Sequence, residues 1–198
     1  MSQQVRVVRE KPNSTLAMNP KKFALWLFLV SIIMIFASLT SAYLVRQAEG
    51  NWLLFEMPSV FMVSTGVILV SSATMHWAFV SAKNNQLVNL KIGIVLTFVL
   101  GLVFLVTQFM GWQKLVEIQV YFAGSSSNPS GSFLYVLSGL HGVHILVGLI
   151  YLLIVLVASF SLKIHSKSMT QIEMCATFWH FLDALWVYLY FFLLLNMK

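Results

Sequence analysis

The sequence has few charged residues and a single cysteine. Asp, Glu, Lys and Arg make up 9% of its 198 residues, whereas soluble domains carry about 25%. The lone Cys175 excludes a disulfide framework within the chain and a metal site built from several of its own thiolates. Apolar residues, in contrast, make up 59% of the chain. This composition predicts a membrane protein.

Five apolar stretches are long enough to cross a bilayer, which takes about 20 residues of helix. Each is expected to be helical, because lipid offers no water to satisfy backbone polar groups. The predicted fold is therefore all-α, a polytopic membrane protein with a bundle of five transmembrane helices in residues 22–198 after a basic tail at 1–21. The helices are expected at residues 22–46, 58–82, 90–113, 132–161 and 172–196.

The distribution of basic residues predicts an N-terminus in the cytoplasm and a C-terminus outside. Lys and Arg outnumber acids in the tail and in the second–third and fourth–fifth connections, whereas the other two connections are balanced. Positive charge accumulates on the cytoplasmic side of membrane proteins. Because this explains much of the net charge of +6, no nucleic-acid partner is expected. The first apolar run, at 23–45, is too long for a signal peptide and is interpreted as a retained helix.

The two connections on the predicted outer side differ in composition. Residues 47–57 contain Trp52, Leu53, Leu54 and Phe55, which suit either an amphipathic turn along the membrane interface or a simple connector. Residues 123–132 read A-G-S-S-S-N-P-S-G-S, a tract expected to be flexible because its composition cannot support packed structure. The chain shows no internal repeat of useful length, so an inverted-repeat transporter gains no support.

Four ionisable side chains lie deep inside the last two predicted helices. His141 and His144 stand about 9 and 12 residues along the fourth helix, or roughly 14 and 18 Å from its start. His180 and Asp183 stand about 8 and 11 residues into the fifth, or roughly 12 and 17 Å deep. All four are therefore expected near the midplane of a core about 30 Å thick. Chargeable groups at that depth are costly and mark interior, partner-facing or functional positions.

The spacing of these four residues favours a contact between the two helices. Each pair is three residues apart and so shares one helix face. Ser138, Gly139, Gly142 and Gly148 are small enough to let another helix approach the fourth closely. We interpret the group as a polar clamp in which Asp183 accepts a hydrogen bond from an imidazole and locks the two helices together. A proton-exchanging cluster is the alternative.

Haem or zinc binding by this chain is not expected. His141 and His144 share a helix face, so they cannot bind one haem iron from opposite sides, and pairing either with His180 leaves little room for a macrocycle. A zinc site at His141, His144 and Asp183 would lie at the membrane midplane, where the ion has no obvious route of access. His76, near the inner end of the second helix, is interpreted as an interfacial residue. Five histidines and one cysteine also cannot supply both a haem–copper centre and a thiolate copper site.

Taken with the five spans, two motifs resemble the third subunit of haem-copper terminal oxidases, the cytochrome c oxidase subunit III family. They are S-G-L-H-G-V-H-I-L-V-G at 138–148 and E-M-C-A-T-F-W-H-F-L-D-A-L-W at 173–186. The family's pattern runs close to G-x-H-G-x-H-x-x-x-G and then E-x(6)-H-F-x-D-x-x-W, so Glu173 joins the four midplane groups in the signature. The resemblance covers residues 20–198, with further matches at 25–31, Pro58 and 100–108.

The resemblance implies a non-catalytic accessory subunit of an enzyme that reduces oxygen to water and translocates protons. Such a subunit stabilises the catalytic subunit and supports turnover and proton uptake. Haem and copper are then expected in partner subunits, and structural phospholipid in a cleft between the first two helices and the remaining bundle. The implied partners are the first and second oxidase subunits, membrane lipids and, as an open alternative, a respiratory supercomplex. Partner or lipid contacts are predicted for Gln108, Trp112, Trp179 and Trp186.

Departures from the family pattern leave some points open. Many members carry a glutamate after the serine matching Ser31, where this chain has Ile32, so no role of that carboxylate carries over. Residues 108–112 read Q-F-M-G-W where many members have Q-x-x-E-Y. The five-span form indicates a bacterial enzyme of the cytoplasmic (inner) membrane. Cytochrome c is favoured as electron donor, with quinol as the alternative. A small transporter or proton channel using the midplane residues, or a membrane cytochrome, are hypotheses from other classes.

Overall fold

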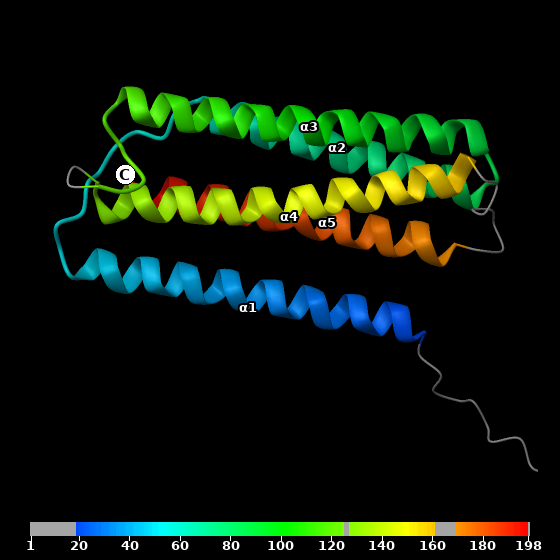
Figure 1. Ribbon diagram of the computed structural model, residues 1–198, viewed down its shortest axis with the longest axis horizontal. Coiled ribbons are helices and arrows are strands. Elements are labelled where there is room, and N and C mark those ends of the chain that lie inside the picture. The colour runs from blue at the N-terminus through cyan, green and yellow to red at the C-terminus, as the bar shows by residue number, and fades with distance from the viewer. Residues whose placement is uncertain (1–18, 125–126, 161–168, 198) are drawn as a thin grey trace, which may run out of the picture.

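The computed structural model describes residues 19–124, 127–160 and 169–197. These residues form five α-helices, each long and apolar enough to cross a membrane, so the predicted all-α fold is confirmed (Figure 1). The basic tail predicted at 1–21 lies almost wholly outside the described residues, as do Lys163 and Lys167 of the fourth–fifth connection. The helices are α1 (Pro20–Ala48), α2 (Val60–Lys83), α3 (Leu87–Glu117), α4 (Pro129–Phe160) and α5 (Thr170–Asn196).

Two of these helices begin at an Asn-Pro pair, earlier than predicted. In α1, Asn19 Oδ1 accepts a hydrogen bond from the backbone N–H two residues on at 3.1 Å, and Pro20 is the first helical residue. In α4, Asn128 Oδ1 does the same at 3.1 Å, and Pro129 follows it. Asn is a favoured helix cap, and Pro fits the first helical position because its missing N–H is not needed there. The prediction of a flexible tract at 123–132 is therefore wrong for residues 128–132.

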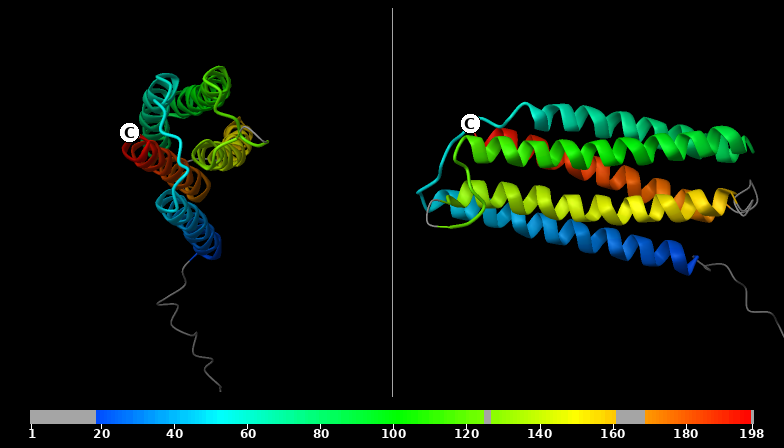
Figure 2. Two further views of the ribbon diagram at one scale, coloured as in Figure 1. Left: turned by 90° about the vertical axis from the view of Figure 1, so that its left-hand side faces the viewer. Right: turned by 45° about the horizontal axis from the view of Figure 1, so that its top comes forward.

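Four helices form a closed bundle, and α1 lies outside it. Helix α2 packs against α3 and α5, while α4 packs against α3 and α5, so the contacts close a ring. Helix α1 contacts α4 and α5 and makes no contact with α2 (Figures 1 and 2). The cleft implied between the first two helices and the remaining bundle is therefore wrong for this chain, because α1 and α2 do not form a unit.

Close approach between α2 and α3 depends on small side chains. A Cβ atom placed on Gly93 of α3 would meet Ala78 Cβ of α2 at 2.7 Å and Ala78 Cα at 3.0 Å. Both distances are shorter than a normal contact, so the two backbones are as near as glycine allows. The turn through Asn84 and Asn85, in which Asn85 has a φ of 56°, brings α3 directly back along α2. This antiparallel pair forms one side of the bundle.

The connection between α1 and α2 is fastened to the bundle and is not a free linker. The Trp52 ring lies 4.7 Å from the Tyr43 ring of α1. The backbone N–H of Leu53 donates to Asn128 Oδ1 at 3.1 Å, and Asn128 Nδ2 donates to the Asn51 carbonyl at 3.2 Å. The residue that caps α4 therefore also holds this connection in place.

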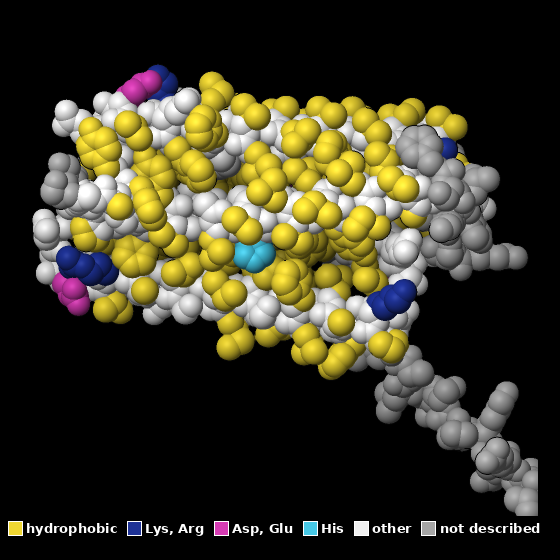
Figure 3. Space-filling view, in the orientation of Figure 1, with side chains coloured by type: hydrophobic (Ala, Val, Ile, Leu, Met, Phe, Trp, Pro, Cys, Tyr) yellow, Lys and Arg dark blue, Asp and Glu magenta, His cyan; other side chains and the backbone are white. Residues whose placement is uncertain are grey.

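The outer surface is apolar along the length of the helices. Figure 3 shows hydrophobic side chains over most of the visible face, with Lys or Arg groups near both ends of the bundle, acidic groups near one end, and a histidine about midway between the ends. This distribution is expected for helices whose middle parts face hydrocarbon. Because successive helices run antiparallel, α1 begins at one end of the bundle and α5 ends at the other (Figure 1). Which end faces the cytoplasm stays a prediction.

Candidate functional site

His141 lies in an aromatic slot inside the bundle. Its side chain is fully buried, with its ring centroid 5.1 Å from that of Trp186 on α5 and 5.7 Å from that of Phe104 on α3. Neither ring nitrogen has a hydrogen-bond partner among the described residues. A buried polar group left unpaired costs about 1–3 kcal/mol. Ring packing therefore holds this side chain, since no hydrogen bond does so.

His144 faces a different neighbour from His141. Its ring lies 5.7 Å from the Phe36 ring of α1, and the side chain is only partly buried. His144 Nδ1 donates to the Leu140 carbonyl of its own helix at 2.8 Å. Because a carbonyl oxygen only accepts, this bond places a proton on Nδ1. His144 thus belongs to the α1–α4 contact and has no part in a contact with Asp183.

His180 and Asp183 face α2. The Nδ1 atom of His180 is 2.7 Å from Ser72 Oγ, and the His180 ring lies 6.1 Å from the His76 ring. Asp183 is 3% exposed, and neither carboxylate oxygen has a hydrogen-bond partner in the described part of the chain. The predicted clamp, in which an imidazole donates to Asp183, is therefore wrong.

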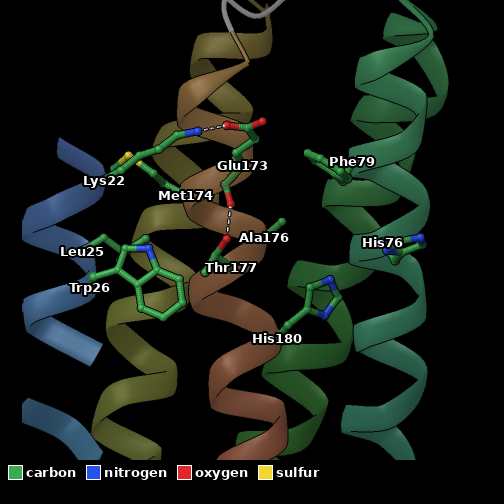
Figure 4. A pocket seen from close by; sticks show the side chains of 10 residues that line it. All are labelled: Lys22, Leu25, Trp26, His76, Phe79, Glu173, Met174, Ala176, Thr177 and His180. Atoms are coloured by element: carbon green, nitrogen blue, oxygen red, sulfur yellow. Dashed lines mark hydrogen bonds and ion pairs between the residues drawn. The ribbon is translucent and has the colours of Figure 1, made fainter. Parts of the chain in front are cut away.

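Glu173 connects α5 to the otherwise separate α1. Its carboxylate lies 2.5 Å from Lys22 Nζ, and both side chains are about two-fifths exposed, at 37% and 43%. Figure 4 shows this pair at the mouth of a groove between α1, α5 and α2. The groove has a volume of about 380 Å³, and its lining is mainly apolar, with His180, His76 and Thr177 as its further polar residues. His76, predicted as an interfacial residue, lies across the groove from α5 (Figure 4).

Besides the contact of His180 with Ser72, three tryptophans make polar contacts between helices of the bundle. In each contact an indole N–H donates to a hydroxyl group on another helix. Such bonds contribute only about 0.6–2 kcal/mol within a membrane, because the unfolded chain also finds hydrogen-bond partners there. The sequence motif identified these tryptophans, but nothing in their spacing indicated which hydroxyl each one meets. The bonds are Trp112 to Ser138 at 3.0 Å, Trp179 to Ser71 at 3.0 Å, and Trp186 to Thr65 at 3.1 Å.

Three of the four residues predicted to contact partners or lipid are buried within this chain. Trp179 and Trp186 are each 1% exposed and Gln108 is 3% exposed, so the prediction is wrong for them. Gln108 Nε2 donates to Ser64 Oγ of α2 at 2.9 Å. Trp112 is partly exposed, and its contact with a partner or with lipid stays a prediction.

Small residues on α4 receive large side chains from neighbouring helices. A Cβ atom placed on Gly148 would meet the Trp179 ring at 3.1 Å, and one placed on Gly101 of α3 would meet it at 2.8 Å. A Cβ atom placed on Gly139 or Gly142 would make only an ordinary contact with α3, at 3.7 Å to Trp112 and 3.8 Å to Leu105, respectively. Trp179 is therefore seated between α3 and α4 while it bonds to α2. One α5 side chain thus touches all three other helices of the ring.

The arrangement as a whole provides packing and one groove, in which a few ionisable groups stand among mainly apolar side chains. Within the described residues, no group of three or more His, Cys, Asp or Glu side chains is placed to hold a metal ion. The signature residues occupy separate surroundings: the aromatic slot of His141, the α1 contact of His144, and the groove side of His180, Asp183 and Glu173. This geometry defines a multi-pass helical membrane protein whose signature residues serve helix contacts and one groove.

Comparison with known proteins identifies the family. A sequence model described as "Cytochrome c oxidase subunit III" matches residues 12–196. Similar proteins include subunit 3 of the cytochrome bo(3) ubiquinol oxidase of Buchnera aphidicola (subsp. Schizaphis graminum), 31% identical over 90% of this chain and 95% of the relative. Subunit 3 of the cytochrome c oxidase of Bacillus sp. PS3 is 30% identical over 90% and 86%, and that of Synechocystis sp. is 32% identical over 86% and 73%. The chain belongs to the cytochrome c oxidase subunit III family, so it is a component of a terminal oxidase complex.

Proposed function

We propose that this chain is the accessory, non-catalytic subunit of a bacterial respiratory haem-copper oxidase. Its role is to stabilise the catalytic subunit and to support oxygen reduction, which such complexes couple to proton translocation. The single observation that carries this proposal is the family match over residues 12–196. The interior agrees with it, because indole–hydroxyl bonds and close helix contacts fill the bundle.

Partner subunits are proposed to hold the haem and copper. The fully buried His141 supports this assignment, since aromatic rings of α3 and α5 pack on it. The partners proposed are the first and second oxidase subunits, within the bacterial inner membrane. A supercomplex with further respiratory enzymes stays an open alternative. Relatives of similar identity carry both cytochrome c and quinol oxidase names, so our preference for cytochrome c rests on the motif variants alone.

Structural phospholipid is proposed for the outer surface of α1. Its outward side chains are strongly exposed, for example Met34 at 67% and Val45 at 62%. Because α1 touches only α4 and α5, much of its circumference needs cover from lipid or from a partner subunit. Phospholipid that copurifies with the oxidase, and whose amount falls when Met34 is replaced by a charged residue, would support this assignment.

Purification in mild detergent through a tag on this chain tests the proposed function. We expect a large complex with haem absorbance, bound copper and oxidase activity, because the subunit associates with the catalytic chain. The same tag on an unrelated multi-pass protein of the same membrane is the control for trapped oxidase. A stable, colourless and solitary protein would contradict the proposal.

A small transporter or proton channel is the hypothesis from a different class. It requires the chain to move protons when reconstituted alone into vesicles. We expect no proton flux above that of empty vesicles, because the bundle interior between His141 and α2 is filled by aromatic rings. Flux that disappears in Asp183→Asn would favour the channel.

A further inference from the structure

The groove between α1, α2 and α5 continues along the bundle past two histidines. It follows α5 from Glu173 to His180, or roughly 10 Å of helix. There it joins a second hollow, which shares His76 and His180 and follows α2 to Leu69, again roughly 10 Å. Figure 2 shows α1 and α2 on opposite sides of α5, and these two helices make no contact with each other. Among the described helices, none lies over this side of α5.

The two histidines place unpaired N–H groups in this groove. Their rings lie 6.1 Å apart, with His180 partly buried and His76 exposed. Ser72 Oγ lies 2.7 Å from His180 Nδ1 and makes no other hydrogen bond among the described residues. Both groups are satisfied when the hydroxyl donates to Nδ1, which leaves His180 with its proton on Nε2 and no acceptor for it. His76 has no hydrogen-bond partner in the described part of the chain, so each ring offers one N–H to whatever covers the groove.

Both rings lie at the depth of the hydrocarbon. Helix α2 ends at Lys83, and the ion pair of Glu173 with Lys22 stands at the mouth of the groove (Figure 4). Such charged side chains at helix ends mark the membrane interface. His76 precedes Lys83 by seven residues and His180 follows Glu173 by seven, or roughly 10 Å along each helix. Acyl chains at this depth offer no acceptor for an N–H, so an occupant made of hydrocarbon alone would leave both rings unpaired.

The rest of the lining suits a helix that carries few polar groups. Its walls are mainly apolar, with Leu25 and Trp26 supplied by α1 and Phe79 by α2. Several of the remaining lining residues are small, and small side chains let another helix approach closely within a membrane. On α5 these residues are Ala176 and Thr177, and on α2 they are Ser72 and Ala73.

We propose that the groove receives a transmembrane helix of another oxidase subunit, whose carboxyl side chain accepts hydrogen bonds from His76 and His180. A carboxyl group has two oxygens and so can accept from both rings at once. Ionisable groups within a membrane pair with one another, and an imidazole that takes up a proton would neutralise an ionised carboxylate. A phospholipid is the poorer occupant, because its acceptor oxygens stay at the level of Lys22. This contact rests on the proposed function and adds to it a place where a partner subunit binds.

Photo-crosslinking in the purified oxidase complex tests this contact. A small diazirine-bearing amino acid replaces Ala73 or Thr177, which are exposed in the groove, and crosslinked peptides are identified by mass spectrometry. We expect both positions to react with one membrane-spanning segment of another subunit, and that segment to contain Asp or Glu. The matched control is the same replacement at Val99 of α3, which is 48% exposed and lies outside the groove. It should not react with that segment.

Replacement of His76 tests the hydrogen bonds themselves. His76→Leu should lower the crosslinking yield from Ala73 by roughly 3- to 30-fold, the range expected for one interhelical hydrogen bond in a membrane. His76→Gln should recover much of the yield, because its amide keeps an N–H donor. The amount of this chain in the membrane should stay the same, since His76 is exposed and makes no hydrogen bond within the described residues. Val80→Leu, one turn further along α2, is the matched control and should leave the yield unchanged.

Other occupants give distinct results. Crosslinks from Ala73 and Thr177 to lipid alone, or to a second copy of this chain, would overturn the proposed contact. A partner segment without Asp or Glu, or an equal yield in His76→Leu, would overturn the role of the histidines. Each of these results is obtained with a chain that copurifies with an oxidase. Failure of the chain to copurify with an oxidase would instead contradict the proposed function.

Discussion

Replacing Gly93 by alanine is expected to push α2 and α3 apart. The added Cβ would lie 2.7 Å from Ala78 Cβ, whereas ordinary contacts begin at 3.4 Å. The helices must therefore separate by the difference, 3.4 − 2.7, or about 0.7 Å at this point. Because the opposing atoms belong to the Ala78 side chain and backbone, no flexible side chain can move away instead. Overpacking of this kind costs about 1–3 kcal/mol.

Gly66→Ala on α2 is the matched control, because a Cβ there would meet nothing within 4 Å. Both replacements gain the same helix propensity, up to about 1 kcal/mol, so this gain cancels when the two variants are compared. We expect Gly93→Ala to be less stable than Gly66→Ala by about 1–3 kcal/mol. Unfolding of the purified chain in mild detergent with increasing dodecyl sulfate, followed by tryptophan fluorescence, measures the difference. Equal unfolding midpoints would refute the close packing of α2 on α3.

Two further predictions concern the polar groups of the interior. A double-mutant cycle of Trp179→Phe and Ser71→Ala should give a coupling free energy of about 0.6–1.7 kcal/mol in the same unfolding assay, and zero coupling would mean that the indole does not bond to this hydroxyl. His141→Leu should change the free energy of unfolding by less than about 1 kcal/mol or increase it, because an unpaired buried polar group is replaced by an apolar one. If His141→Leu instead lowered the free energy of unfolding by several kcal/mol, His141 would have to make a hydrogen bond that the structure lacks.

The helices themselves were predictable because lipid leaves the backbone few alternatives. An apolar stretch of about 20 residues in hydrocarbon has to be a helix, and each of the five predicted stretches corresponds to one helix of the structure, although their end residues differ. The starts of α1 and α4 were missed although the Asn-Pro pairs at Asn19 and Asn128 carried the signal. Composition alone suggested a flexible tract around Asn128, whereas a cap and a following proline begin a helix there.

The partners of the signature residues were not predictable from spacing. Residues three apart share a helix face, but which neighbour that face meets depends on helix rotation and on the order of packing. His141 and His144 illustrate this, since one meets α5 and the other α1. The indole–hydroxyl bonds were missed because Ser71 and Thr65 stand among several similar hydroxyls of α2. The exclusion of α1 from the ring also depends on tertiary packing, which no local pattern encodes.

The most direct test of the account is the distribution of haem and copper when the complex is taken apart. The oxidase is purified through this chain, the chain is released with a harsher detergent, and metal and haem are measured in both fractions. The described residues pack the helices together and include no group of three or more His, Cys, Asp or Glu side chains placed to hold a metal ion. Haem and copper should therefore remain with the other subunits, and the released chain should be colourless. Haem or copper bound in a one-to-one ratio to the released, folded chain would contradict the account.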